Sequence, residues 1–107
     1  MIERLLEKLR ETGIQFEDGG WSVAPNTNYG TVRLDGQADA LYADDAMQEQ
    51  AIAGSVHLFT KGAGRTQMAA VQEALNSLGI CWRLNSIQYE EGTRLTHYEW
   101  RFEIEAM

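Results

Sequence analysis

Apolar residues recur every three or four positions in two stretches of the chain, which is the period of a helix with one buried face. The first stretch ends before Gly13, a helix stop signal. The second runs from about Arg65 to Leu78, and Gly79 is placed as its C-terminal cap. The two apolar stripes consist of Ile2, Leu5, Leu6 and Leu9, and of Met68, Val71, Leu75 and Leu78. The pattern predicts two amphipathic helices.

Strict alternation of apolar and polar residues predicts strands elsewhere. "AIAGSVHLFT" (51–60) has one apolar face, and "TRLTHYEWRFEIE" (93–105) has another. In the last run, Tyr98, Trp100, Phe102 and Ile104 face one way, and His97, Glu99, Arg101 and Glu103 face the other. The strand predicted just before this one is "ICWRLNSIQYEE" (80–91). Its apolar residues change parity after Leu84, which predicts a bulge near Asn85-Ser86. A turn at Glu91-Gly92 is expected to join these last two strands into a hairpin.

The segment between the first helix and the strand at 51–60 is rich in turn residues. "IQFEDGGWSVAPNTNY" (14–29) predicts a long loop with one short strand around Trp21–Val23. "GTVRLDGQADALYAD" (30–44) alternates around Val32, and Asp35-Gly36 lies between two runs, which is typical of a hairpin turn. The second run of this hairpin ends in Leu41 and Tyr42.

The order of these elements is helix, strands, helix and two strands. This order predicts an α+β fold: a mainly antiparallel sheet of about four to five strands with two helices packed against it. The chain has 107 residues, 44% of them hydrophobic, and a single proline. We expect a single domain covering residues 1–107, with so little core that association with further copies is a common way to bury more surface.

The charge balance narrows the possible partners. Sixteen acidic residues against nine basic ones give a formal net charge of −7 at pH 7, and the basic residues form no run. Because nucleic-acid binding needs concentrated positive charge, we expect no sequence-specific nucleic-acid binding. No apolar run approaches the roughly 20 residues that span a bilayer, and "MIERLLEKLRETG" is unlike a signal peptide, so we expect no membrane partner and a protein that stays inside the cell that makes it.

The lone cysteine, Cys81, excludes an internal disulfide and a cysteine metal cage. It lies in the apolar string "GICWRL", and we therefore expect it to be a small core residue in a reducing compartment.

"VHLFTKGAGRTQ" joins a strand to a helix through two glycines, the kind of place where a phosphate can bind. A Walker loop needs four residues between its glycines, followed by Lys and Ser or Thr. A dinucleotide fingerprint needs a third glycine, at the position of Gln67. Gly62 and Gly64 fit neither pattern, and Lys61 precedes them instead of following them. We expect no nucleotide or other cofactor here.

The only two histidines, His57 and His97, each lie on a predicted strand, and Glu99 shares a face with His97. Such a set is compatible with a metal site or an acid/base pair, but no third ligand stands at a recognised spacing. The chain also has no Gly-x-Ser-x-Gly and no cysteine with a histidine nearby in the sequence. We therefore predict no catalytic, metal or cofactor residues and a protein that is not an enzyme.

The succession "YGTVRLDGQADALYADDAMQEQAIAGSVHLFT", an amphipathic helix and "LNSIQYEEGTRLTHYEWRFEIE" resembles small proteins encoded among the head–tail connection genes of long-tailed bacteriophages and prophages. It is most similar to a tail terminator or tail completion protein. The resemblance covers about Tyr29 to Glu105 and rests on element order, chain length and the closing strand "LTHYEWRFEI".

The resemblance implies an α+β subunit without catalytic residues that assembles with copies of itself, commonly as a six-fold ring, on the end of the tail tube. It further implies tail tube and head-completion proteins as partners, and a place in the virion after assembly in the bacterial host cytoplasm. An acidic ring would not hold the phosphates of DNA that slides through it. By position, the candidate assembly and partner interface consists of Leu34, Asp35, Gly36, Leu41 and Tyr42 in the expected hairpin, and of Lys61, Gly62, Gly64 and Arg65 in the glycine loop.

Two other functions remain open from the sequence. One is a small adaptor or inhibitor that binds another phage or bacterial protein as a monomer. The other is a small-molecule-binding enzyme that uses His57, His97 and Glu99.

Overall fold

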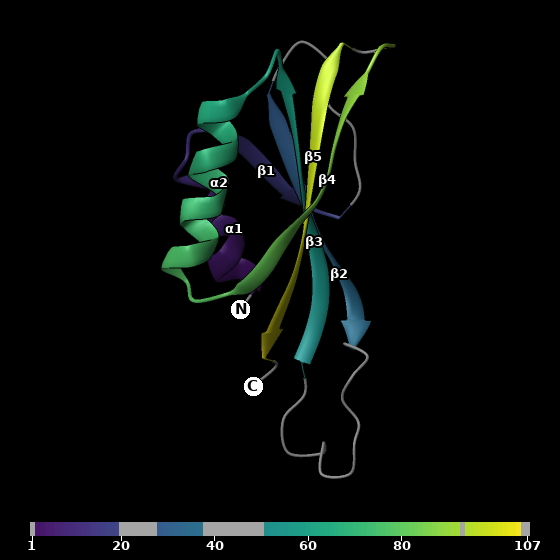
Figure 1. Ribbon diagram of the computed structural model, residues 1–107. Helices are drawn as coiled ribbons and strands as arrows, with labels where there is room; N and C mark the ends of the chain where they lie inside the picture. The colour runs from purple at the N-terminus through teal and green to yellow at the C-terminus, as the bar shows by residue number, and fades with distance from the viewer. Residues whose placement is uncertain (1, 20–27, 38–50, 93, 106–107) are drawn as a thin grey trace.

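The structure is a computed structural model that describes residues 2–19, 28–37, 51–92 and 94–105. Two helices lie on the same side of a five-stranded sheet (Figure 1). The elements in chain order are α1 (Ile2–Arg10), β1 (Gln15–Asp18), β2 (Tyr29–Gln37), β3 (Ala51–Lys61), α2 (Arg65–Ser77), β4 (Cys81–Glu90) and β5 (Leu95–Glu105). The predicted α+β fold is confirmed. In the part of the chain that the structure describes, no helix has the length and apolar character needed to cross a membrane.

The strands lie in the order β1-β2-β3-β5-β4. β1 runs parallel to β2, and every other neighbouring pair is antiparallel. The sheet is therefore mixed, with its one parallel pair at an edge. β3 and β5 form its centre and pair along eleven residues each.

The core lies between the helices and the face of the sheet that they cover, which we call the helix face. Trp100 on β5 is fully buried at its centre, and its indole Nε1 donates a hydrogen bond to Gln72 Oε1 on α2 at 3.1 Å. Trp82 Nε1 on β4 donates to Asn76 Oδ1 at 2.9 Å. Fully buried core residues include Leu5, Leu9, Phe16, Val32, Val56, Leu58, Val71 and Leu75. Among the side chains that the structure describes, which do not include Ile2, the predicted apolar stripes of both helices and the predicted buried face of β5 are confirmed.

The predicted hairpin turn at Asp35-Gly36 is wrong, because β2 runs through both residues to Gln37. Leu34 pairs with Gly54 of β3 and Gly36 pairs with the next residue, so Asp35 is the extra residue of a β-bulge. Asp and Gly tolerate the irregular backbone of a bulge as well as that of a turn, which is why the local signal was misleading. Leu41 and Tyr42 lie outside the described residues.

The predicted loop at 14–29 begins with a strand, β1, at Gln15–Asp18. The strand expected around Trp21–Val23 lies outside the described residues. The bulge predicted near Asn85-Ser86 is confirmed by a register shift between Leu84 and Ser86. The turn after β4 is confirmed by the hydrogen bond from Arg94 N to Glu90 O at 2.7 Å.

The expectation that Cys81 is a core residue is wrong, because its side chain is exposed. Cys81 begins β4, a strand at the edge of the sheet, and pairs there with Glu103 on the face away from the helices. Its neighbour Ile80 takes the buried position instead, at 7% exposure.

Candidate functional site

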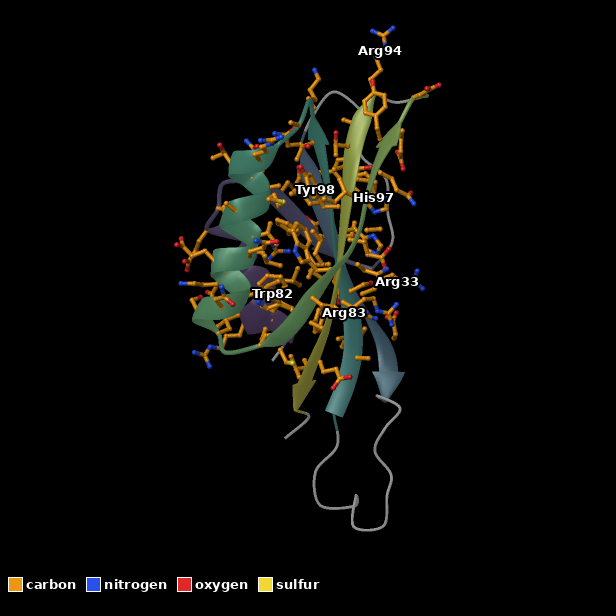
Figure 2. The ribbon with its side chains drawn as sticks, in the orientation of Figure 1. Arg33, Trp82, Arg83, Arg94, His97 and Tyr98 are labelled. Atoms are coloured by element: carbon orange, nitrogen blue, oxygen red, sulfur yellow. The ribbon has the colours of Figure 1, made fainter. Side chains whose placement is uncertain are left out.

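The two histidines meet on the face of the sheet away from the helices, which we call the outer face. His57 on β3 and His97 on β5 lie diagonally across the pair of central strands, because His57 is opposite Glu99 and His97 is opposite Phe59. Their ring atoms His57 Nδ1 and His97 Nε2 are 2.8 Å apart, which is a hydrogen bond. Figure 2 shows His97 on this face and Trp82 on the side of the helices.

The histidine pair extends into a longer polar chain. Ser55 Oγ lies 3.1 Å from His57 Nε2, and Glu90 Oε2 lies 3.7 Å from His97 Nδ1. Of the two facing nitrogens, one donates and the other accepts, so the tautomers of the two neutral rings are coupled.

Aromatic rings pack beside the histidine pair on the same face. Phe59 stacks on His97, with ring centroids 4.2 Å apart, and Tyr29 stacks on Phe59, with centroids 4.7 Å apart. Each stacked pair contributes about 0.5–1.5 kcal/mol beyond the burial of its area. The stack fixes the ring plane of His97.

Burial lowers the pKa of His57, because the half-buried ring loses the water that would stabilise its charged form. The neighbouring His97 lowers the pKa of His57 further, Glu99 raises it, and Arg33 and then Asp35 have smaller effects, lowering and raising it respectively. The His57 imidazole is therefore neutral at pH 7.

Burial also lowers the pKa of His97, against smaller opposing effects of Glu90 and Glu99. Burial and the charge of Glu90 raise the pKa of Tyr29, which keeps its phenol protonated at neutral pH. The outer face therefore holds two neutral imidazoles, those of His57 and His97, which share one hydrogen bond.

The cluster of Ser55, His57, His97 and Glu90 supports fewer chemical functions than these residue types alone would allow. Among the described residues, no three or more His, Cys, Asp or Glu side chains are grouped closely enough to hold a metal ion. The ring centroids of the two imidazoles are 5.0 Å apart. His57 Nδ1 and His97 Nε2, the nitrogens that face each other, are occupied by their mutual hydrogen bond. Ser55 is only 4% exposed, so its hydroxyl is not accessible to a substrate. The arrangement can take up protons and join β3 to β5.

The glycine loop is a tight turn that side chains tie to the sheet. Gly62 and Gly64 have φ angles of 69° and 63°, which favour glycine. Thr96 Oγ1 on β5 donates to Gly62 O at 2.7 Å, and the Tyr98 hydroxyl donates to Ala63 O. The glycines are explained by this turn. Lys61 ends β3, and Arg65 begins α2; both are exposed.

Large exposed apolar side chains occupy both edges of the sheet. In the described part of the chain these are Leu34 on β2 and Leu84, Ile87 and Tyr89 on β4, with exposed fractions of 42%, 38%, 53% and 59%. By register, all four have the parity of the helix face. The helices cover part of that face, and these four side chains stay exposed on it.

Both edges also have strand backbone that pairs on one side only. Within the described residues, β4 pairs with β5 and with no other strand. Among the described residues, β2 pairs with β1 only at Tyr29–Val32, and its second half, Arg33–Gln37, pairs with β3 alone.

The structure does not bring the two predicted interface groups together. Leu34 lies opposite Gly54 and Lys61 ends the same strand, β3, seven residues later, about 23 Å along it. The sequence prediction missed the apolar residues of β4, although the parity change of Ile87 and Tyr89 is visible in the sequence. That β4 is an edge strand depends on the strand order, which local patterns do not contain.

No protein-family model matches this chain, and a search of curated proteins finds no match for it.

Proposed function

We propose that this chain is a structural subunit of the head–tail junction of a long-tailed bacteriophage or prophage, of the tail terminator or tail completion type. In this role it assembles with copies of itself into a ring at the end of the tail tube. The proposal takes its biological setting from the sequence resemblance. The observation that carries its self-assembly is the exposed apolar side chains on one face at both edges of the sheet.

Exposed apolar edges favour association for two physical reasons. Burying Leu34, Leu84 and Ile87 against another chain removes apolar area from water, at roughly 25 cal/mol per Å². Pairing the free strand backbone satisfies peptide groups and covers a template for uncontrolled aggregation.

The two edges of the sheet allow a ring. β1 and the second half of β2 form one edge and β4 forms the other, so contact between opposite edges of neighbouring copies is a head-to-tail contact. Head-to-tail contacts repeat until the rotation between copies closes a ring, or else continue as a filament. A six-fold ring that meets the tail tube on one side and a head-completion protein on the other fits this type of contact.

Sedimentation velocity over a concentration series, with and without purified tail tube protein, tests the proposal. We expect the wild-type protein to shift from monomer to one larger species. Ile87→Asp places a charge on the exposed apolar row and is expected to stay monomeric, with an unchanged far-ultraviolet circular dichroism spectrum. Gln88→Asp is the matched control, because it adds the same charge to the next residue, on the outer face, and is expected to assemble like the wild type.

Two results would contradict the proposal. A wild-type protein that stays monomeric at all concentrations, with and without tail tube protein, is not a ring subunit. A monomer that forms a one-to-one complex with a host or phage protein would instead support the adaptor function.

A further inference from the structure

We infer that a row of arginines on the outer face of the sheet docks an acidic segment of another protein. The arginine row consists of Arg33 on β2, Arg101 on β5 and Arg83 on β4. It lies on the opposite side of the sheet from the exposed apolar side chains of the proposed assembly, so the inference does not depend on that assembly.

Strand pairing brings the three arginines into one line across the sheet. Arg33 is opposite Ser55 of β3, Ser55 is opposite Arg101, and Arg101 is opposite Arg83. Residues directly opposite each other point to the same face of a sheet, which here is the outer face. Figure 2 shows Arg33 and Arg83 on the side of the sheet away from the helices. Three of the nine basic residues of the chain therefore share one row, although the sequence contains no basic run.

The two ends of the arginine row carry unpaired charges. Arg33 and Arg83 are exposed, and neither has an ion-pair partner among the described residues. Arg101, between them, has the carboxylate of Asp35 3.6 Å from its guanidinium. Because Arg83 lies directly opposite Arg101, the two like charges destabilise the isolated chain. An anion bound between them would turn this repulsion into attraction.

A hollow beside the start of β4 leaves room for a carboxylate at this end of the row. It has a volume of about 280 Å³ and is lined by Arg83, Arg101, Cys81 and Glu103, among others. A guanidinium binds a carboxylate through two parallel N–H groups. A carboxylate that enters the hollow can therefore accept hydrogen bonds from Arg83 and Arg101.

The surroundings of the arginine row favour a short acidic segment of a protein over a nucleic acid. Glu99 lies in the next row on one side, and Glu103 lies in the next row on the other. A nucleic acid that continued past the arginines would bring its phosphates to these carboxylates, on a chain with a net charge of −7. A peptide with few carboxylates can place all of them on the arginines.

The length of the arginine row fits an extended peptide. Arg33 and Arg83 are three strand spacings apart, which is about 14 Å. Residues four positions apart in an extended chain are separated by about the same distance and point the same way. We therefore expect a segment with acidic residues at alternate positions to fit the row.

Fluorescence anisotropy with a labelled peptide tests the inference. The probe is a fluorescein-labelled peptide of alternating Glu and Thr with three Glu residues, and the reference peptide has Gln in place of each Glu. At a low salt concentration of about 0.05 M, where charges are weakly screened, we expect saturable binding of the Glu peptide. The Gln peptide should bind about tenfold more weakly, because a neutral amide forms no charge-assisted hydrogen bond with arginine.

Two double variants separate the arginine row from the overall charge. Arg33→Gln/Arg83→Gln removes the two unpaired charges and is expected to weaken binding of the Glu peptide about tenfold. Arg4→Gln/Arg65→Gln is the matched control, because it removes two exposed charges from the helices and leaves the same net charge. We expect the control to bind the Glu peptide like the wild type, and both variants to keep the circular dichroism spectrum of the wild type.

Three results would overturn the inference. The first is the absence of saturable binding of the Glu peptide, or equal binding of the Glu and Gln peptides. The second is equal weakening in the two double variants, which would assign the binding to overall charge. The third is tighter binding of a hexathymidylate oligonucleotide than of the Glu peptide, which would identify a nucleic acid as the occupant. Monomers in sedimentation velocity, with peptide binding retained, would overturn the proposed function and leave this inference standing.

Discussion

His57 and His97 join β3 to β5 through a hydrogen bond that forms when both rings are neutral. The hydrogen bond between Nδ1 and Nε2 needs one donor and one acceptor, so it is lost when both rings are protonated. Two imidazolium rings at this distance would also repel each other across the centre of the sheet.

Lowered histidine pKa values make the stability of the fold depend on pH. In the unfolded chain both rings titrate near the ordinary value of 6.5, whereas burial lowers both pKa values in the folded protein. The unfolded state therefore binds more protons below about pH 6.5. The stabilisation is fully present above that pH and is lost as the pH falls through the folded pKa values.

We expect the free energy of unfolding in urea to decrease when the pH is lowered from about 7.5 to about 5.5. The variant His57→Gln/His97→Gln removes both titrating rings, so its unfolding free energy should decrease less over the same interval. An equal decrease in the variant and the wild type would assign the pH dependence to the carboxylates instead.

The sequence placed both histidines on strands, and it placed His97 on the polar face of its strand. It did not reveal that they touch, because the contact depends on the register of β3 against β5, which side-chain alternation leaves undetermined. Glu90, the last residue of β4, enters the same cluster for the same reason.

Helices and strand faces follow from local periodicity: α1, α2, β3, β4 and β5 lie where the periodicity predicts them, whereas β1 was not predicted and the hairpin at Asp35-Gly36 was wrong. α1 and α2 carry a clear apolar stripe, and β5 alternates from His97 to Glu105, so each has only one way to bury its apolar side. Strand order and the parallel β1–β2 pair depend on long-range packing. The same local dipeptide, Asp35-Gly36, occurs in turns and in bulges, and only the pairing partner decides between them.

The turn between β3 and α2 depends on glycine to different degrees at its two glycine positions. A side chain at Gly64 would meet Thr60, whose Cβ is 2.6 Å from the position of the added Cβ, whereas a side chain at Gly62 would meet nothing within 4 Å. Both residues have positive φ, so both substitutions strain the backbone.

We expect Gly62→Ala to lower the free energy of unfolding by about 1–2 kcal/mol, which is the cost of the left-handed conformation. Gly64→Ala should cost about 1–3 kcal/mol more, because the added methyl group overpacks against Thr60. Urea denaturation of the two variants beside the wild type measures the difference. Equal costs would mean that Thr60 moves aside without loss.

At the scale of the whole molecule, the sheet extends beyond the helix layer along its strands (Figure 1). α1 lies against β1 and α2 lies against β4, and Leu34 and the apolar residues of β4 stay exposed. A chain of this size buries only about two thirds of its surface on folding, so apolar edges of this kind are surface that a second copy can cover. The core and the proposed interface thus belong to one apolar sheet face.

Net charge opposes the assembly that the apolar edges favour. Each chain carries a formal charge of −7, so neighbouring copies repel one another over distances greater than that of any single contact. Salt screens this repulsion, with a Debye length of about 10 Å at 0.1 M, while the burial of apolar side chains is not weakened by it. Raising sodium chloride from about 0.05 M to about 0.5 M should therefore lower the protein concentration at which half of the chains are assembled, as measured by sedimentation velocity. Dissociation at high salt would instead mean that charge pairs, and not the exposed rows of Leu34 and Ile87, hold the subunits together.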